Sequence, residues 1–166
     1  MTDLQWRWYA WEQLDPDTLY GFLRLRSEIF VVEQNCVFPD MDGVDPRCTH
    51  LCGRDAQGRL LAYLRLLPPG VERAVHTVEG ERAPSAPGPA LGRLVVHADA
   101  RGKGLARAAM LEGLRICAFR YGGQPVSLSA QRHLSHFYAS LGFREASEPY
   151  LEDGIWHVDM RRDAAA

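Results

Sequence analysis

The sequence has no long apolar segment and no marked excess of charge of either sign. Its apolar runs are short, such as residues 60–64, whereas a membrane-crossing helix needs about 20 consecutive apolar residues. The 19 Lys and Arg residues face 21 Asp and Glu residues, giving a formal net charge of -2. A domain that coats nucleic acid is normally clearly basic. These absences argue against a membrane protein and against a nucleic-acid partner.

Cysteine is scarce, and the first residues lack the apolar core of a secretory signal peptide. Without such a signal, the four cysteines are expected to be reduced thiols in a cytoplasmic protein. Cys48, His50 and Cys52 lie close together, but the second ligand pair of a structural zinc site is missing. We therefore expect a cytoplasmic protein that binds no metal.

The length of 166 residues and the hydrophobic content of 46% fit one globular domain, residues 1–166. Alternating apolar residues predict a first strand over residues 4–10, and Asp15 followed by Pro16 predicts the start of a helix that runs to about residue 30. Further strands are expected over residues 49–54, 59–67, 91–97, 126–130, 143–146 and 155–161, with helices over 101–120 and 133–141. Residues 68–89, rich in Pro, Gly, Ala and Ser, are expected to be the most mobile stretch. This order predicts an α/β (α+β) domain with a mixed sheet flanked by helices.

The most informative segment is the turn and helix start over residues 101–107. A helix start offers up to four unpaired N–H groups and about half a positive charge. Arg101, Lys103 and Arg107 gather there, and no acidic residue follows until Glu112. Such cations oppose the helix dipole at roughly 0.3–1 kcal/mol each, whereas charge-assisted hydrogen bonds to a polyphosphate contribute about 1.5–3 kcal/mol each. The pattern predicts a phosphate-binding loop; a solvated basic helix start is the alternative.

The loop matches neither the Walker motif nor the dinucleotide fingerprint, which requires a small residue where Arg107 stands. It does match R-x-x-G-x-A, and the chain resembles the GNAT superfamily of N-acetyltransferases, whose signature is Q/R-x-x-G-x-G/A. The resemblance implies that the loop binds the pyrophosphate of acetyl-coenzyme A and that the preceding strand pairs with the pantetheine arm. The residues so implied are Leu94, Val95, Val96, Arg101, Gly102, Lys103, Gly104, Leu105, Ala106 and Arg107.

A second segment, residues 133–143, resembles a later motif of the same superfamily. The resemblance implies that Tyr138 protonates the departing thiolate, and a phenol that is protonated at pH 7 can do so. Gln131 stands seven residues earlier, where the family often has Asn, and its amide can reach the pantetheine arm. The alternative for Tyr138 is a buried aromatic residue with a satisfied hydroxyl.

A narrower resemblance, to the ElaA-type branch of the superfamily, covers most of the chain. It rests on residues 25–36, 40–45, His50 and 150–157, with Trp156 where that branch often has Pro. The branch implies no particular substrate. The fold that the resemblance implies is a single GNAT-type domain with a mixed sheet of six or seven strands.

The acceptor site is expected between the loop after the first helix and the last hairpin. Acid-rich walls there would attract a cationic amine, and the amine must lose a proton before it attacks. Glu33 is the predicted base, with an imidazole as the alternative. His50, Asp153 and His157 are predicted to contact the acceptor. The acidic residues of these stretches are Glu33, Asp40, Asp42, Asp45, Glu148, Glu152 and Asp153.

Together these observations predict an acetyl-CoA-dependent N-acetyltransferase that moves an acetyl group to a primary amine of a small molecule or a protein. Acetyl-CoA would be the acyl-donor cosubstrate, with no metal. Two alternatives stay open at this point: a non-catalytic acyl-CoA-binding or interaction domain, and transfer of longer acyl chains. The sequence leaves the oligomeric state open, a homodimer included.

Overall fold

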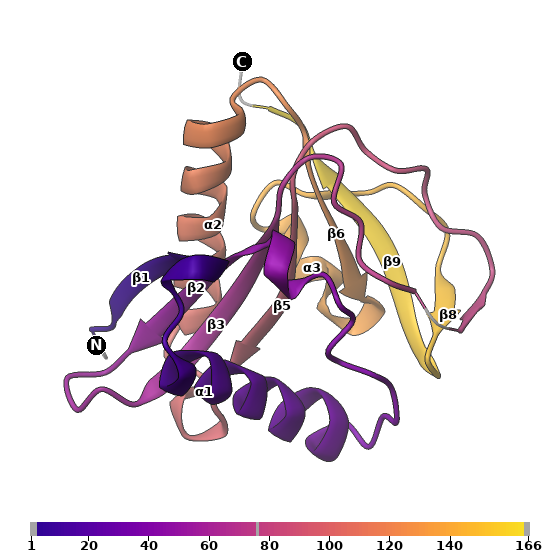
Figure 1. Cartoon of the computed structure of the whole chain (residues 1–166). Coiled ribbons are helices and arrows are strands. Elements are labelled where there is room, and N and C mark those ends of the chain that lie inside the picture. Colours follow the sequence, from indigo (N-terminus) through magenta and orange to yellow (C-terminus); the bar gives the residue numbers. More distant parts are fainter. Residues whose placement is uncertain (1–2, 76, 165–166) are drawn as a thin grey trace.

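The chain folds around one mixed sheet that includes strands from both ends of the sequence (Figure 1). The computed structural model describes residues 3–75 and 77–164. Within this part of the chain the sheet has nine strands: eight follow the order β1-β2-β3-β5-β6-β9-β8-β4, and the ninth, β7, pairs with β9. Only β5 and β6 pair in parallel among the described residues. The strands are β1 (Gln5–Ala10), β2 (Thr49–Arg54), β3 (Leu60–Leu67), β4 (Val78–Glu79), β5 (Ala90–Val96), β6 (Val126–Gln131), β7 (Arg144–Glu145), β8 (Tyr150–Glu152) and β9 (Ile155–Arg162).

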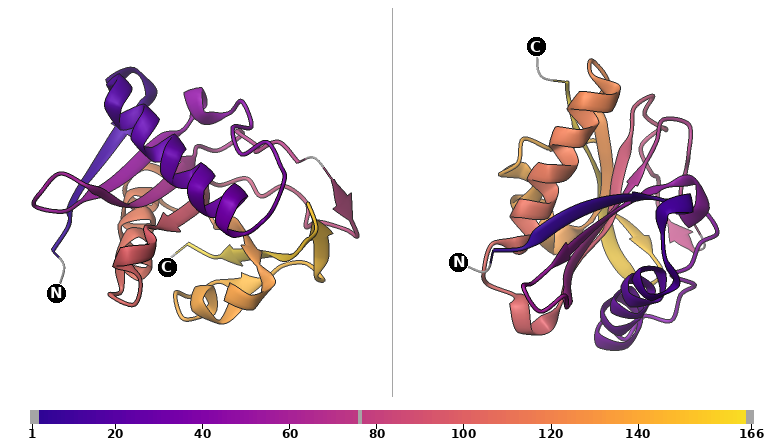
Figure 2. Two further views of the ribbon diagram at one scale, coloured as in Figure 1. Left: turned by 90° about the horizontal axis from the view of Figure 1, so that it is seen from below. Right: turned by 60° about the vertical axis from the view of Figure 1, so that its left-hand side comes forward.

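Helices cover both faces of this sheet. In Figure 2, α1 lies on one side, and α2 and α3 lie on the other. The predicted fold class, a single α/β domain with a mixed sheet flanked by helices, is confirmed. Six or seven strands were expected; the additional ones are β4 and β8, whose two and three residues are too short to leave a periodic pattern. The helices are α1 (Pro16–Arg26), α2 (Leu105–Tyr121) and α3 (Ser135–Ala139), with short turns η1 (Trp11–Gln13), η2 (Ser27–Glu33), η3 (Asp45–Arg47), η4 (Ala98–Ala100) and η5 (Arg132–Leu134).

The start of α1 follows the predicted signal. The Asp15 carboxylate accepts hydrogen bonds from the Thr18 backbone N–H at 2.8 Å and from its hydroxyl at 2.7 Å, which caps the helix. Pro16 occupies the first turn, where its missing N–H costs nothing. The helix then continues as the π-helical turn η2 to Glu33, slightly past the predicted end at residue 30. None of the helices in the described part of the chain is long and apolar enough to cross a membrane.

The sheet opens between its two central strands. β5 and β6 share one paired position, Ala90 with Ser127, and then separate. A bulge in β5 lies next to this opening. From Gly92 to Val95, β5 advances by three residues while the paired strand β3 advances by only two. Arg93 lies in the bulge with a φ of 53°, in the left-handed region that few side chains adopt. The opening and the bulge together create space in the middle of the sheet.

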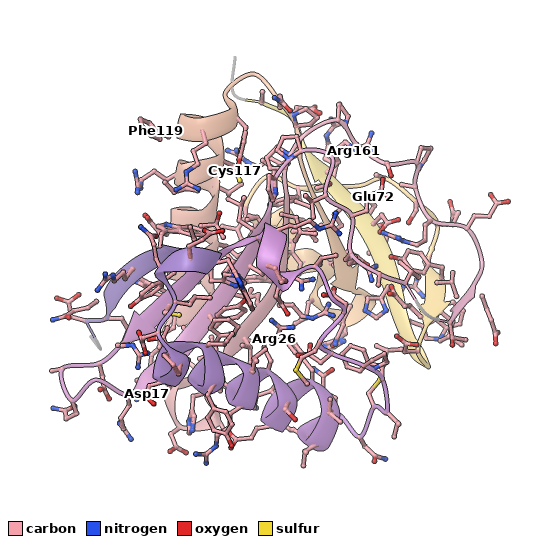
Figure 3. The ribbon with its side chains drawn as sticks, in the orientation of Figure 1. Asp17, Arg26, Glu72, Cys117, Phe119 and Arg161 are labelled. Atoms are coloured by element: carbon pink, nitrogen blue, oxygen red, sulfur yellow. The ribbon has the colours of Figure 1, made fainter. Side chains whose placement is uncertain are left out.

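Beneath α1, three arginines and three aspartates form an interior network of ion pairs. It joins α1, the segment that follows η2, β3 and the bulge in β5. Figure 3 labels one member, Arg26, between α1 and the sheet. The arginine–aspartate network consists of Arg26, Asp40, Asp42, Asp45, Arg65 and Arg93.

The pairs of this network are close and well shielded from water. Arg26 contacts Asp40 and Asp45, each at 2.8 Å, and its side chain is 0% exposed. Arg65 contacts Asp42 at 2.7 Å and Asp45 at 2.9 Å, and is equally buried. Burial alone would raise the pKa of Asp42, but its hydrogen bonds with Arg65 and the positive charge of Arg65 hold that pKa at about 2.

This arrangement corrects one expectation from the sequence. Asp40, Asp42 and Asp45 do not form an acidic wall that attracts an amine, because their charges are neutralised by buried arginines. Their effect is structural: they fix the segment after η2 against the β5 bulge.

We predict that Asp45→Ala lowers the free energy of unfolding by about 3–5 kcal/mol, because Arg26 and Arg65 would both lose a partner inside the protein. Urea denaturation followed by circular dichroism measures this. The control is Glu28→Gln, which removes an exposed i,i+4 partner of Arg24 and should leave stability nearly unchanged. Similar losses for the two variants would contradict a special role for the network.

Candidate functional site

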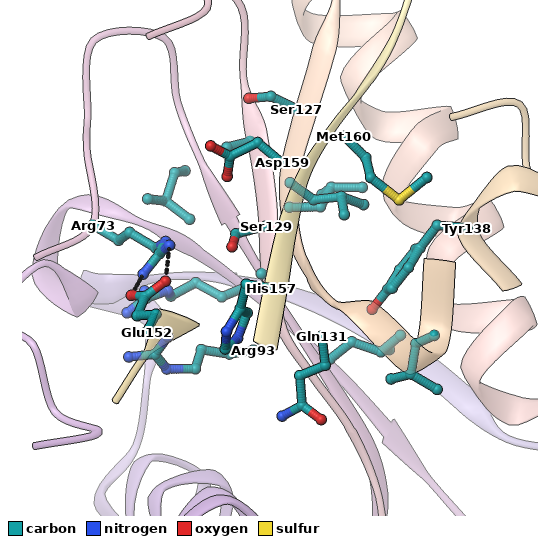
Figure 4. Close-up of a pocket in the computed structure, with 18 of the residues that line it drawn as sticks. Arg73, Arg93, Ser127, Ser129, Gln131, Tyr138, Glu152, His157, Asp159 and Met160 are labelled. Carbon is teal, nitrogen blue, oxygen red and sulfur yellow. Dashed lines mark hydrogen bonds and ion pairs between the residues drawn. The ribbon is translucent and has the colours of Figure 1, made fainter. Parts of the chain in front are cut away.

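A cavity of about 720 Å³ passes through the opening between β5 and β6 (Figure 4). Its walls come from η2, β5, β6, α3 and β9 and from residues 68–75 and 77–89, which we call the strap. Residues from both faces of the sheet therefore reach one continuous space. A cavity lined by apolar side chains and a few convergent polar groups is the usual form of a small-molecule site.

The helix start predicted to bind an anion lies beside this cavity. The left-handed residue Gly104, with a φ of 76°, precedes α2, and no side chain caps the helix. Gly102 is also left-handed, at 73°. A Cβ built at either glycine would meet no atom within 4 Å, so the outer side of the turn is open. The backbone can therefore approach a ligand closely at both positions.

The backbone amides of this turn have no protein partner in the described part of the chain. From residue 102 to residue 107, no N–H donates a hydrogen bond to another described residue; the next donor is Ala108, to the Gly104 carbonyl at 3.0 Å. Unpaired helix-start amides favour a negatively charged ligand. The geometry thus fits the predicted phosphate-binding loop.

The positive charge of the three cationic side chains around this loop is only partly neutralised by acidic side chains. Arg101 pairs with Glu33 at 2.8 Å, and both side chains are nearly half exposed. Lys103 and Arg107 donate only to neutral oxygens, the Asp99 carbonyl at 3.3 Å and the Ser140 hydroxyl at 2.9 Å. Two of the three charges near the helix start are therefore not neutralised by an acidic side chain.

The other residues predicted to bind the cofactor differ in which of their groups can reach a ligand. Leu94, Val95, Val96 and Ala106 line the cavity together with Arg101. The Leu105 side chain is buried in a core cluster with Leu4 and Leu61, so only its backbone is available to a ligand. Gln131 ends β6 at the cavity wall, and its Nε2 donates to Gln34 Oε1 at 2.9 Å, which ties β6 to the end of η2.

Tyr138 projects from α3 into the cavity, as labelled in Figure 4. Its ring lies edge-on to Phe137 and Phe143, with centroid distances of 5.0 and 6.3 Å. Burial raises the pKa of its hydroxyl to about 12, so the phenol keeps its proton at neutral pH. The hydroxyl makes no hydrogen bond to any described residue, in contrast to the alternative of a satisfied core tyrosine.

His157 reaches the cavity from β9, on the opposite face of the sheet. Val158 and Met160 pack with Tyr138 in the main core cluster, so the alternating residues His157 and Asp159 point the other way. Nδ1 of His157 lies 2.8 Å from the Ile155 carbonyl, which can only accept, so Nδ1 carries the proton. Nε2 is then left as a lone-pair acceptor in the cavity wall, and burial lowers the pKa of the ring.

Of the remaining predicted site residues, Asp153 and Glu33 line the cavity and His50 does not. Asp153 lines the cavity at the β8–β9 turn, with a left-handed φ of 49°. Glu33 lines it too, but its carboxylate is paired with Arg101. His50 does not contact the cavity: it is fully buried, its Nε2 donates to the Asp45 carbonyl at 3.0 Å, and its Nδ1 accepts from the Tyr63 hydroxyl at 2.7 Å. The prediction that His50 contacts the acceptor is therefore wrong; the residue is part of the core.

Sequence reasoning missed Arg93, whose guanidinium lines the cavity. A signal was present, because Gly92 and Arg93 interrupt an otherwise apolar strand, and a glycine in a strand often marks a bulge. The contribution of the strap was missed as well, since its composition predicts no regular structure. Arg73 of the strap pairs with Glu152 (Figure 4), and this pair could not be found from spacing.

Comparison with known proteins gives a consistent result. Residues 81–164 match the family described as the acetyltransferase (GNAT) domain. The protein ElaA of Escherichia coli is 34% identical over 162 residues, which are 96% of this chain and 97% of that protein. Its crystal structure superimposes with a TM-score of 0.82 over 97% of this chain and 100% of that chain, at 33% identity. An acyl-CoA N-acyltransferase from Pseudomonas aeruginosa gives a TM-score of 0.83 at 39% identity, over 96% of this chain and 99% of that chain. The expected resemblance to the ElaA-type branch is thereby confirmed.

We predict that His157 is neutral and protonated on Nδ1 at pH 7, because the Ile155 carbonyl selects that tautomer and burial lowers the pKa from its ordinary 6.5. Two-bond ¹H–¹⁵N correlation spectra of the imidazoles measure this. His50 is an internal control, since its partners select the opposite tautomer and burial lowers its pKa to about 4. A charged or Nε2-protonated His157 at pH 7 would contradict the assignment.

Proposed function

We propose that this chain, which belongs to the GNAT acetyltransferase family, transfers an acetyl group from acetyl-coenzyme A to a primary amine. The observation that carries the proposal is the run of unpaired amides at residues 102–107, beside the opening between β5 and β6. An anionic ligand satisfies the amides, and an extended arm of the same ligand fits between the separated strands. Acyl-coenzyme A has both parts, a pyrophosphate and a pantetheine chain.

The cosubstrate would be held by backbone and side-chain groups of different kinds. The amides after Arg101 bind the pyrophosphate, with Lys103 and Arg107 supplying positive charge. The β5 backbone over Leu94–Val96 is unpaired on its β6 side in the described structure, so it can pair with the amides of the pantetheine arm. These contacts bring the thioester to the opening between Tyr138 and His157.

The candidate acid Tyr138 and the candidate base His157 lie on opposite faces of the sheet and line the same cavity. His157 Nε2 accepts a proton from the bound ammonium, directly or through water, and the free amine nitrogen attacks the thioester carbon. A C–N bond forms and the C–S bond breaks. The Tyr138 hydroxyl, whose raised pKa keeps it protonated at neutral pH, donates its proton to the departing thiolate. The second proton that the nitrogen loses as the amide forms returns to the Tyr138 oxygen through water, which restores the phenol. Positioning both reactants in this way supplies up to about 7–11 kcal/mol in well-oriented systems.

Glu33 has a different part in this mechanism from the one expected from the sequence. Its carboxylate is paired with Arg101 at 2.8 Å at the phosphate-binding end of the cavity. The Arg101 guanidinium contacts both Glu33 oxygens, at 2.8 and 3.0 Å, so each oxygen already has a donor. We therefore propose that Glu33 positions Arg101 and that His157 is the general base.

We predict that Gly104→Ala weakens coenzyme A binding about tenfold or more, because a methyl group at a left-handed residue both strains the turn and covers the amides. Isothermal titration calorimetry measures the dissociation constant. Gly58→Ala is a matched control, since Gly58 has a φ of 79° and equally open surroundings but lies in the β2–β3 turn. Equal affinities in the two variants would place the anion elsewhere.

We predict that wild-type protein releases free thiol from acetyl-CoA in the presence of a primary amine, and that Tyr138→Phe slows this release about 10²–10⁴-fold while coenzyme A still binds. A panel of amines with a thiol-reactive dye measures turnover, and octanoyl-CoA in parallel reports the acyl-chain preference. A non-catalytic acyl-CoA-binding domain would release no thiol with any amine. Unchanged turnover in Tyr138→Phe would remove Tyr138 from the mechanism.

A further inference from the structure

We propose that the acceptor is a small amine that also carries a carboxylate, an amino acid or a short amino-carboxylate, and that Arg93 binds its carboxylate. The proposal rests on the proposed function and specifies its substrate class. Two independent features support it: the strap forms a wall on the acceptor side of the cavity, and Arg93 presents an N–H group there that has no acceptor in the described part of the chain.

The strap is attached to β8 and β9 at several points along its length. Arg73 makes a bidentate pair with Glu152, with 2.8 Å between Arg73 Nη2 and Glu152 Oε2. β4 pairs with β8, and the Ala83 N–H donates to the Asp159 carboxylate at 2.8 Å. Arg161, labelled in Figure 3, donates to the Pro84 carbonyl at 3.1 Å. A segment expected to be mobile thus forms a wall of the cavity.

This wall limits the size of the acceptor. The strap contributes a long series of cavity-lining residues on the same face of the sheet as His157. An extended peptide that presents a lysine normally lies in an open groove or along a free strand edge. Here the edge of β8 is occupied by β4, and β4 belongs to the strap. The strap therefore leaves less room for an extended peptide than for a small acceptor.

Two acidic side chains of the compartment, Glu152 and Asp159, already have donors. Glu152 is neutralised by Arg73. Asp159 accepts hydrogen bonds from Ala83 and from the Tyr150 hydroxyl, at 2.8 and 2.7 Å, and lies 3.7 Å from Arg82. Such groups have little capacity left for a charged ligand.

Arg82, Arg93 and Arg161 of the cavity wall each keep an N–H group without an acceptor among the described residues. The Arg82 side chain is the more exposed, at 35%, and Arg161 Nε is enclosed by protein atoms, so we assign the carboxylate contact to Arg93.

Arg93 Nε donates to Asp40 Oδ1 at 2.8 Å, and its Nη2 donates to the Asp40 carbonyl at 3.0 Å. Its Nη1 has no acceptor among the described residues and is not enclosed by protein atoms. Because the side chain lines the cavity and is 14% exposed, Nη1 is available to a ligand there. The left-handed backbone of the β5 bulge holds the guanidinium in this place.

The electrostatics favour an anion at this guanidinium. Arg26 and Arg65 each have two aspartate partners at 2.9 Å or less, whereas Arg93 has one close aspartate, and its contact with Asp42 is 3.5 Å. Burial and the nearby positive charge of Arg65 lower the pKa of Arg93, whereas the pKa values of Arg26 and Arg65 are raised. A carboxylate on Arg93 would compensate this charge through a charge-assisted hydrogen bond. The amine of the same molecule can then approach His157 in the same cavity.

The test compares matched acceptors in the thiol-release assay with acetyl-CoA. The panel contains free L-amino acids and β-alanine, each with its carboxamide, together with a polyamine and a lysine-containing decapeptide. We expect at least one free acid to have kcat/KM about tenfold or more above its carboxamide, since the amide lacks the charge that Arg93 binds. The decapeptide should give no turnover. Calorimetry of that acid and its amide with the coenzyme A-bound protein should show binding of the acid alone.

Variants of two arginines then assign the carboxylate contact. Arg93→Gln should reduce the acid-to-amide ratio of kcat/KM to about one, a loss of roughly tenfold or more. Arg82→Gln, a strap arginine on the same cavity, should keep the wild-type ratio. The ratio is measured within each variant, so a smaller folded fraction of Arg93→Gln does not affect it.

The outcomes separate this proposal from the proposed function. Turnover of carboxamides, polyamine or decapeptide at the same rate as the acids, or better, would overturn the amino-carboxylate proposal and leave acyl transfer intact. An unchanged ratio in Arg93→Gln would overturn the role of Arg93. An absence of thiol release with every compound would overturn acyl transfer itself, and the substrate class with it.

Discussion

The buried arginine–aspartate network is the interaction on which the rest of this structure depends. Fully enclosed ion pairs are costly to form, because desolvation of each ion offsets much of the attraction between them. Here the pairs hold one loop, one helix and two strands in a fixed relation. They keep Arg93 in a left-handed conformation within β5. The bulge at that residue lies beside the place where β5 and β6 separate, so the network supports the cavity itself.

The opening in the sheet divides the site into two sides with different chemistry. On the α2 and α3 side lie unpaired amides, positive charge and the Tyr138 phenol. On the α1 side lie a neutral imidazole, paired acids and the strap. A sheet with complete pairing would keep these sets apart, because a backbone layer would lie between them. The loss of a few β-ladder hydrogen bonds is what lets the two sets line one cavity.

The sequence predicts those parts of the structure whose causes are local. Asp15 and Pro16 set the start of α1, and the spacing of glycines and cations around Gly104 singles out the turn whose amides are unpaired. It fails where a residue's role depends on distant partners. Asp42 looks like a surface acid until β3 brings Arg65 to it, and His50 looks like a base until Tyr63 and the core enclose it. The strap has no hydrophobic periodicity from which its position could be predicted. Single contacts, such as that of Arg73 with Glu152, hold it in place.

The uncapped start of α2 links occupancy of the site to the folding equilibrium. Helix-start amides without protein partners make the free protein less stable. A polyphosphate that accepts hydrogen bonds from them binds the folded chain and not the unfolded chain. Such a ligand adds about 2.7 kcal/mol to the folding free energy at a concentration one hundred times its dissociation constant. The melting temperature and protease resistance of this protein would therefore rise with the concentration of a ligand that binds this turn.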